Sequence, residues 1–128
     1  MDVLALRKSS GEIQGEVRLN GHLQEETSFR RCTGYVEQFD VQSAQLTIRE
    51  TVAFSAKLRL EETDPAVTEE SIRAFVDQTL YMLELTNLQD LQVGSDDTGG
   101  LSFEQTKRLS IAVELVSNPS ILFLDEPT

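Results

Sequence analysis

The sequence predicts an α/β fold in which a helical segment interrupts a sheet. The first observation is an apolar run, residues 121–124, which is bounded by prolines and followed at once by Asp125 and Glu126. A run this short between prolines favours a buried strand over a helix. The second observation is an amphipathic helical pattern directly before this strand. The third is an alternation of apolar and polar residues near the N-terminus, which is typical of a strand.

The acidic pair after residues 121–124 is a candidate for chemistry on phosphates. In open α/β sheets, ligands bind beyond the carboxyl ends of the strands, where Asp125 and Glu126 would lie. Proteins that transfer phosphate use one acid to hold Mg²⁺ and a second to orient an attacking water. The alternative is a core strand that ends in an acidic turn and has no catalytic role.

A helix that could face a phosphate is predicted to start at Ser102. Gln105 follows Ser102 by three residues, which is the pattern of a capping box. The first N–H groups and the dipole of such a helix favour a phosphate, although the pair could also serve only as an N-cap. The helix then presents an apolar face that predicts core packing: Leu109, Ala112, Val113 and Val116.

A second strand is predicted over residues 33–38, where it ends at Gln38. A neutral amide can bind Mg²⁺ weakly through its carbonyl oxygen, and it can orient a water without adding charge. It can also swing away when a loop moves, which suits a sensor of bound nucleotide. The alternative is a polar residue at a strand end that has no function.

Local patterns predict the remaining elements. Thr47 and Glu50 form another capping box, which predicts a helix that runs to about Leu60. The other expected elements are helical character over residues 1–6, a strand over 15–21 with a turn at Asn20-Gly21, a helical turn over 28–31, an acidic loop over 61–65 and a helix over 68–85.

The order and spacing of these motifs resemble the nucleotide-binding cassette of ATP-binding cassette (ABC) transporters. There a Leu-Ser-x-x-Gln signature loop, here residues 101–105, opens a helix that leads to the Walker B strand, here residues 121–126. Leu-Ser-x-Glu-Gln followed by Lys-Arg-Leu is similar to the G subfamily, of the pleiotropic drug resistance type. The resemblance covers nearly the whole chain. It implies a P-loop NTPase fold, with a RecA-like part in residues 1–42 and 118–128 and a helical subdomain in 43–117.

The resemblance also implies roles for five residues. Asp125 would hold Mg²⁺ through water, Glu126 would be the general base for the attacking water, and Gln38 would bind Mg²⁺ as the Q-loop glutamine. Ser102 and Gln105 would contact the γ-phosphate of an ATP held by a second cassette, in a head-to-tail dimer. Closure of that dimer would move the transmembrane domain of the parent transporter, which by resemblance is an exporter.

The sequence departs from the family pattern in three places. It contains no G-x-x-x-x-G-K-[ST] motif, so we expect a cassette fragment whose phosphate loop would precede Met1 and whose own ATPase activity is low. Phe103 and Glu104 replace the two glycines of the general ABC signature, although the G-subfamily proteins that the chain resembles share the glutamate. A carboxylate beside a phosphate repels it unless the side chain turns away. Leu6 stands where the resembled proteins usually have glycine.

Composition and charge limit the possible partners. The formal net charge of −11 opposes nonspecific binding to nucleic acid or anionic lipid. The single cysteine, Cys32, excludes an internal disulfide, and neither Cys32 nor His22 has the spacing of a metal site. We expect several basic residues to be scattered and solvated: Arg7, Lys8, Arg30, Arg31, Lys107 and Arg108.

Two other functions stay open beside a transport ATPase. The chain could be a noncatalytic interaction module that pairs with a complete cassette, or a soluble ABC ATPase that acts on nucleic acid. Copurification without ATP turnover would indicate the first, and salt-sensitive binding to nucleic acid would indicate the second. Neither a signal peptide nor a transmembrane segment is predicted, so we expect a place at the cytoplasmic face of a membrane only through the parent transporter.

Overall fold

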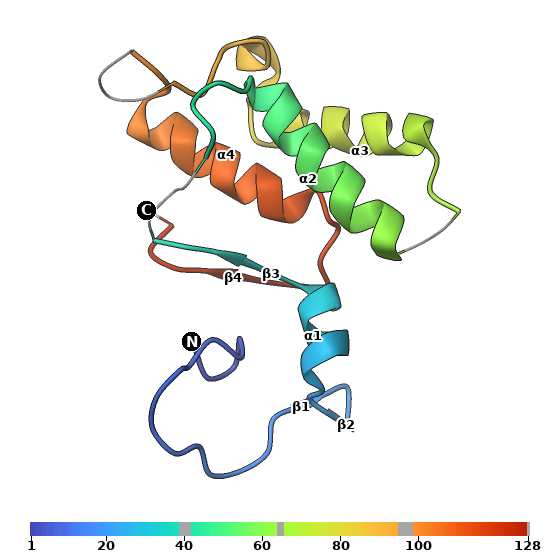
Figure 1. Cartoon of the computed structure of the whole chain (residues 1–128), viewed down its shortest axis with the longest axis vertical. Coiled ribbons are helices and arrows are strands. Elements are labelled where there is room, and N and C mark those ends of the chain that lie inside the picture. The colour runs from blue at the N-terminus through green and yellow to red at the C-terminus, as the bar shows by residue number, and fades with distance from the viewer. Residues whose placement is uncertain (39–41, 64–65, 95–98, 128) are drawn as a thin grey trace.

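The computed structural model describes residues 1–38, 42–63, 66–94 and 99–127 of the chain. Helices and strands both occur, as the predicted α/β class requires (Figure 1). Within these ranges, none of the helices combines the length and the apolar character that crossing a bilayer requires. The elements are β1 (Arg18–Leu19), β2 (His22–Leu23), α1 (Glu26–Cys32), β3 (Thr33–Val36), α2 (Ile48–Thr63), α3 (Glu69–Met82), the 3₁₀ helix η1 (Thr86–Leu88), α4 (Phe103–Leu115) and β4 (Ile121–Leu124).

Helix α4 forms the central layer of the fold. It contacts β3 on one side and α2 and α3 on the other. Figure 1 shows α4 between the strand pair and the other two long helices. A side chain on α4 can therefore contact either the strand ends or the helical layer.

Strands β3 and β4 form a parallel pair, with Thr33 opposite Ile121 and Val36 opposite Leu124. Both predicted strands are therefore confirmed, although β3 ends at Val36 rather than at Gln38. The expectation that β4 is buried is wrong, because all of its residues are only half-buried. The reason is that α4 packs on β3, and it covers one side of the pair.

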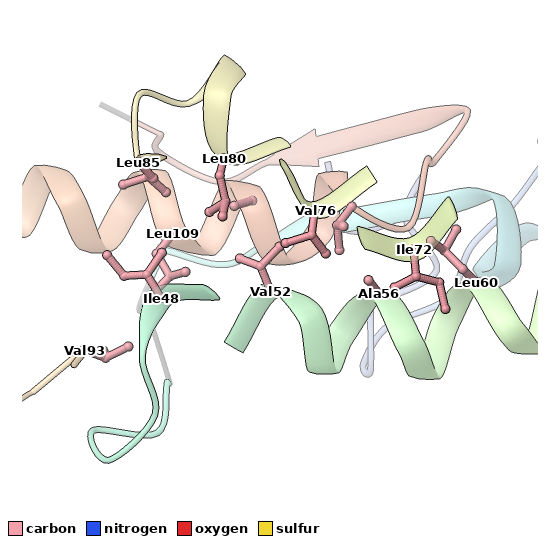
Figure 2. Packing of buried hydrophobic residues seen from close by; sticks show 12 residues of the cluster. Ile48, Val52, Ala56, Leu60, Ile72, Val76, Leu80, Leu85, Val93 and Leu109 are labelled. Atoms are coloured by element: carbon pink, nitrogen blue, oxygen red, sulfur yellow. The ribbon is translucent and has the colours of Figure 1, made fainter. Parts of the chain in front are cut away.

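The hydrophobic core lies among α2, α3, α4 and the segment that follows α3 (Figure 2). It includes most of the apolar face predicted for α4, since Leu109, Ala112 and Val116 are fully buried. Two large residues of α2 lie outside it, with Phe54 63% and Leu58 57% exposed. The core consists of Ile48, Val52, Ala56, Leu60, Ile72, Val76, Leu80, Leu85, Val93, Leu109, Ala112 and Val116.

The predicted helix starts are confirmed, whereas two predicted helix ends are wrong. At the start of α2, the Thr47 N–H donates to Glu50 Oε2 at 2.8 Å and the Glu50 N–H donates to Thr47 Oγ1 at 3.2 Å, so both bonds of the predicted capping box are present. The end of α2 is Thr63, because buried Leu60 anchors its last turn and the helix continues into the expected acidic loop. Residues 64–65 of that loop lie outside the described residues. Helix α3 ends at Met82, because Glu84 has a φ of 57° and leaves the helical region.

The N-terminal region differs most from expectation. Residues 1–6 form turns rather than a helix, because Leu6 has a φ of 56°, which a right-handed helix cannot continue. The strand expected over residues 15–21 is only the short β1, which pairs with β2 across the predicted Asn20-Gly21 turn. The helical turn expected over residues 28–31 is confirmed as part of α1.

Candidate nucleotide site at the ends of the parallel strands

The parallel register brings the predicted acidic pair, Asp125 and Glu126, and the Gln38 amide together at one end of the sheet. The Asp125 N–H donates to the Val36 carbonyl at 3.0 Å, which extends the ladder beyond the strands. The Gln38 side chain lies opposite Glu126, and its Nε2 donates to Glu126 Oε2 at 2.6 Å. One polar group thus forms from residues that are far apart in the sequence: Gln38 after β3, and Asp125 and Glu126 after β4.

Asp125 is held by a tyrosine that the sequence did not single out. The Tyr35 hydroxyl lies 3.2 Å from Asp125 Oδ2 and 3.1 Å from Asp2 Oδ1. Burial raises the pKa of Tyr35 to about 12, and the hydrogen bonds and negative charges of Asp2 and Asp125 act in the same direction. The phenol therefore stays neutral at physiological pH and remains a hydrogen-bond donor to the carboxylates.

A basic side chain stands over this tyrosine. The Arg7 guanidinium lies 4.2 Å from the centre of the Tyr35 ring and forms an ion pair with Glu37. A cavity of about 260 Å³ opens beside the polar group. It is lined by Asp2, Arg7, Tyr35, Glu37, Gln38 and Asp125.

The donor set at the strand ends fits Mg²⁺ that is shared with a nucleotide. Mg²⁺ usually keeps several waters and binds one or two carboxylates together with substrate phosphates. Asp125 and Glu126 supply two carboxylates, and the hydrogen bond from the Gln38 nitrogen leaves its amide oxygen for a cation. In the described parts of the chain, no group of three or more His, Cys, Asp or Glu side chains could hold a metal by itself. The site is therefore suited to a metal that arrives with phosphate ligands.

The signature residues form a second group at the N-terminus of α4. Ser102 Oγ accepts from the Gln105 N–H at 3.2 Å, and Gln105 Oε1 accepts from the Ser102 N–H at 2.9 Å. This reciprocal pair confirms the predicted capping box. Within the described residues, each of these side chains accepts from the other residue's backbone N–H, and neither bonds to Gln38 or the acidic pair.

Glu104, which replaces a signature glycine, is held by an ion pair. Its carboxylate pairs with Arg108, and the Arg108 guanidinium also reaches Glu84 Oε2 at 2.7 Å. These hydrogen bonds, first to Glu104 and then to Glu84, raise the pKa of Arg108. The neighbouring Phe103 is 75% exposed. The carboxylate is thus drawn along α4 toward Arg108, which reduces the repulsion that the sequence suggested.

Lys107 corrects the expectation that the basic residues are all solvated. It is only 6% exposed and is the one charged side chain among the buried residues that the structure describes. Its Nζ donates to the carbonyl oxygens of Glu37, at 3.3 Å, and Gln38. Lys107 therefore joins α4 to the backbone that carries the site glutamine.

A signal for this contact exists in the sequence. Lys107, Ser110 and Glu114 are spaced by about one and two helical turns, so they share one side of α4. Glu114 lies on the sheet-facing side, because its Oε2 accepts from the Tyr35 N–H at 3.2 Å. A polar row beside the apolar stripe thus marks the face that meets β3.

Comparison with known proteins agrees with this geometry. A family model described as ABC transporter matches residues 3–128, and such a match implies the P-loop NTPase fold and ATP binding. ABC transporter G family member 31 of Arabidopsis thaliana is 51% identical over 128 residues, and member 42 of Oryza sativa subsp. japonica is 50% identical over 130 residues. Both alignments cover 100% of this chain, which spans 9% of the length of each relative. The chain therefore belongs to the ABC transporter family and is similar to its G family members.

Proposed function

We propose that this chain is part of the nucleotide-binding cassette of an ABC transporter, where it binds and hydrolyses ATP to power transport, by resemblance export, across a membrane. The observation that supports this proposal most directly is the contact between Gln38 and Glu126 beside Asp125, at the ends of two parallel strands. The proposed division has a RecA-like part in residues 1–42 and 118–128 and a helical subdomain in residues 43–117.

In this proposal, the acidic pair has two different tasks. Mg²⁺ bound with ATP would neutralise charge on the phosphates. Asp125, which is half-buried and held by the Tyr35 hydroxyl, would bind that ion from a fixed position. Glu126 is exposed and would accept a proton from the attacking water. Gln38 would orient the water and the ion through its amide, since it already lies against Glu126.

The N-terminus of α4 would serve a second cassette. Ser102 and Gln105 would turn from their mutual capping bonds to the γ-phosphate of an ATP bound on that partner. The ion pair of Glu104 with Arg108 supports this role, because it holds the Glu104 carboxylate, which replaces a signature glycine, away from an approaching phosphate. Two cassettes would close head to tail around two nucleotides.

The transmembrane domain of the transporter is the other proposed partner, and it would keep the cassette at the cytoplasmic face of the membrane. A largely apolar cavity of about 370 Å³ beside α2 supports an attachment there. Phe54 and Leu58, the two exposed apolar residues of α2, line it together with Leu46. Binding to nucleic acid is not part of this proposal, since the net charge of −11 opposes it.

Calorimetry with Mg-ATP tests the binding half of the proposal. We expect weak binding to the chain alone, loss of the heat in Asp125→Asn, and no change in Asp90→Asn, a matched control at an exposed aspartate. Equal binding by the chain and Asp125→Asn would mean that the acidic strand end is not the metal site.

A segment exchange tests the catalytic half. The aligned 128 residues of the Arabidopsis member 31 would be replaced by this chain, which is 51% identical to them, and ATP turnover would be measured against the unmodified relative. We expect turnover that falls by roughly 10²–10⁴-fold in Glu126→Gln, the size of a lost general base. Unchanged turnover in Glu126→Gln would exclude Glu126 as the base. A folded chimera that pairs with a cassette but has no turnover would favour the noncatalytic module.

A further inference from the structure

The contact between Lys107 and the segment after β3 takes no part in the proposed binding or hydrolysis of ATP. A lysine buried to this degree is unusual, because burying an ammonium group costs free energy unless its donors are satisfied. Here Nζ donates to two successive carbonyl oxygens, those of Glu37 and Gln38. Both of these hydrogen bonds go to the main chain, at the point where β3 has ended and the glutamine begins.

This contact completes a continuous path between the two groups of site residues. Ser102 and Gln105 cap the first turn of α4, and Lys107 lies in the next turn. Lys107 holds the carbonyl of Gln38, whose side chain donates to Glu126 Oε2 at 2.6 Å. A shift of α4 along the sheet would therefore pull on the backbone of Gln38.

A second contact on the same face of α4 keeps the helix in register with the strand. Glu114 lies two turns after Lys107, and its Oε2 accepts from the Tyr35 N–H at 3.2 Å and from Arg59 at 2.8 Å. The two contacts lie two turns apart on the helix, so α4 is fixed both to β3 and to the segment that follows it. Only the Lys107 contact reaches the residue that touches Glu126.

We infer that Lys107 is a positioning residue, which sets the Gln38 amide against Glu126 and so couples the signature end of α4 to the hydrolytic site. The inference rests on the proposed function for its effect on ATP turnover, but the coupling itself is a property of the chain without nucleotide. Lys107 acts through the backbone of Gln38, whose carbonyl accepts from its Nζ.

Nuclear magnetic resonance of the ¹⁵N-labelled chain tests the coupling. The side-chain NH₂ signals of Gln38 are identified as those missing from Gln38→Met. Glu126→Gln removes the charged acceptor and gives the position of these signals when Gln38 no longer donates to a carboxylate. We expect Lys107→Gln to shift the signals most of the way to that position, and Lys107→Arg, which keeps a charged donor, to shift them less.

Two controls separate coupling from loss of charge or loss of stability. Lys57→Gln makes the same substitution at an exposed lysine of α2, and Thr68→Ala removes a capping hydroxyl from α3. Both should leave the Gln38 side-chain signals in place. A folded Lys107→Gln chain with an unchanged Gln38 signal would overturn the inference.

A reciprocal measurement keeps the inference testable if Lys107→Gln fails to fold. Coupling between two sites is mutual, so Gln38→Met should shift the ammonium signal of Lys107 and leave that of Lys57 unchanged. Gln38 is exposed, so its replacement should preserve the fold. A Lys107 signal that ignores Gln38→Met would also overturn the inference.

Turnover in the segment-exchange chimera distinguishes this inference from the proposed function. We expect Lys107→Gln to lower kcat by roughly 10–100-fold while nucleotide binding stays the same, because a small misplacement of a catalytic group costs rate rather than affinity. An unsubstituted chimera without turnover would refute the proposed function but leave the resonance result to decide the coupling. If the unsubstituted chimera is active and Lys107→Gln leaves its kcat unchanged, the positioning role alone would be refuted.

Discussion

Tyr35 connects three parts of the chain through one hydroxyl group. It reaches Asp125 after β4 and Asp2 near the N-terminus, while its ring lies under Arg7. Tyr35→Phe keeps the ring and removes both hydrogen bonds. We expect a loss of about 1 kcal/mol in the free energy of unfolding at pH 7, measured by urea titration. A variant as stable as the parent chain would mean that water replaces the hydroxyl without cost.

The raised pKa of Tyr35 also predicts how stability depends on pH. The phenol holds its proton more tightly when folded than when unfolded, with a pKa of about 12 against the ordinary 10.0. Its contribution to stability is therefore complete below about pH 10 and is lost as the pH rises toward 12. Thermal unfolding between these values should show a fall in Tm that is smaller in Tyr35→Phe. Parallel curves for the two proteins would contradict this assignment.

Gly34 is the residue that allows β3, β4 and α4 to meet. A Cβ at this position would lie 2.8 Å from Leu122 Cδ1 and 3.2 Å from Glu114 Oε2. Gly34→Ala should therefore lower the free energy of unfolding by about 1–3 kcal/mol, the usual cost of overpacking. Adding Leu122→Val, which shortens the opposing side chain, should recover part of this loss. Simple additivity of the two changes in a double-mutant cycle would argue against the clash.

At the scale of elements, the two capping boxes of α3 and α4 form a natural matched pair. Thr68 Oγ1 accepts from the Ser71 N–H at 3.2 Å, and Ser102 Oγ accepts from the Gln105 N–H at the same distance. Thr68→Ala and Ser102→Ala should each cost about 1 kcal/mol of stability in urea unfolding. In the segment-exchange chimera, only Ser102→Ala should also lower ATP turnover. Equal turnover in the two variants would reduce Ser102 to a helix cap.

The sequence best predicted those elements that are determined by residues close together in the chain. A capping box is written within four residues, so the starts of α2 and α4 were predictable from Thr47 and Ser102. The burial of Lys107 depends on carbonyl groups about seventy positions away in the chain, and charge alone suggested a solvated side chain. The exposure of β4 was missed for a similar reason, because an apolar run does not indicate how many neighbouring elements will cover the strand. Residues 1–6 formed turns because of the backbone angle at Leu6, which no helical pattern reveals.

At the scale of the molecule, the fold separates stability from chemistry. The hydrophobic core lies among the helices, on the far side of α4 from the strand ends. The site groups project from the ends of β3 and β4, where the Asp125 N–H donates to the Val36 carbonyl. Variants at Gln38 and Glu126, both exposed, can therefore change activity without large changes in stability.

The net charge of the molecule predicts that it does not bind nucleic acid. Nonspecific nucleic-acid binders have Kd values of roughly 10⁻⁴–10⁻⁶ M at physiological salt. With a formal charge of −11, the chain should show no binding to labelled single-stranded DNA or RNA at protein concentrations up to roughly 10⁻⁴ M. Fluorescence anisotropy measures this, with a basic protein of similar size as the positive control. Binding that weakens steeply with added salt would instead favour the ATPase that acts on nucleic acid.

The two ends of the contact made by Lys107 differ in how well they tolerate mutation. Its accepting end consists of main-chain carbonyls, which every amino acid supplies, so the link survives whatever side chain occupies position 37. Its donating end is a single ammonium group, and one codon change at position 107 removes both bonds together. Inherited variation near this site should therefore accumulate at position 37 and be scarce at position 107, even though the two positions share one contact.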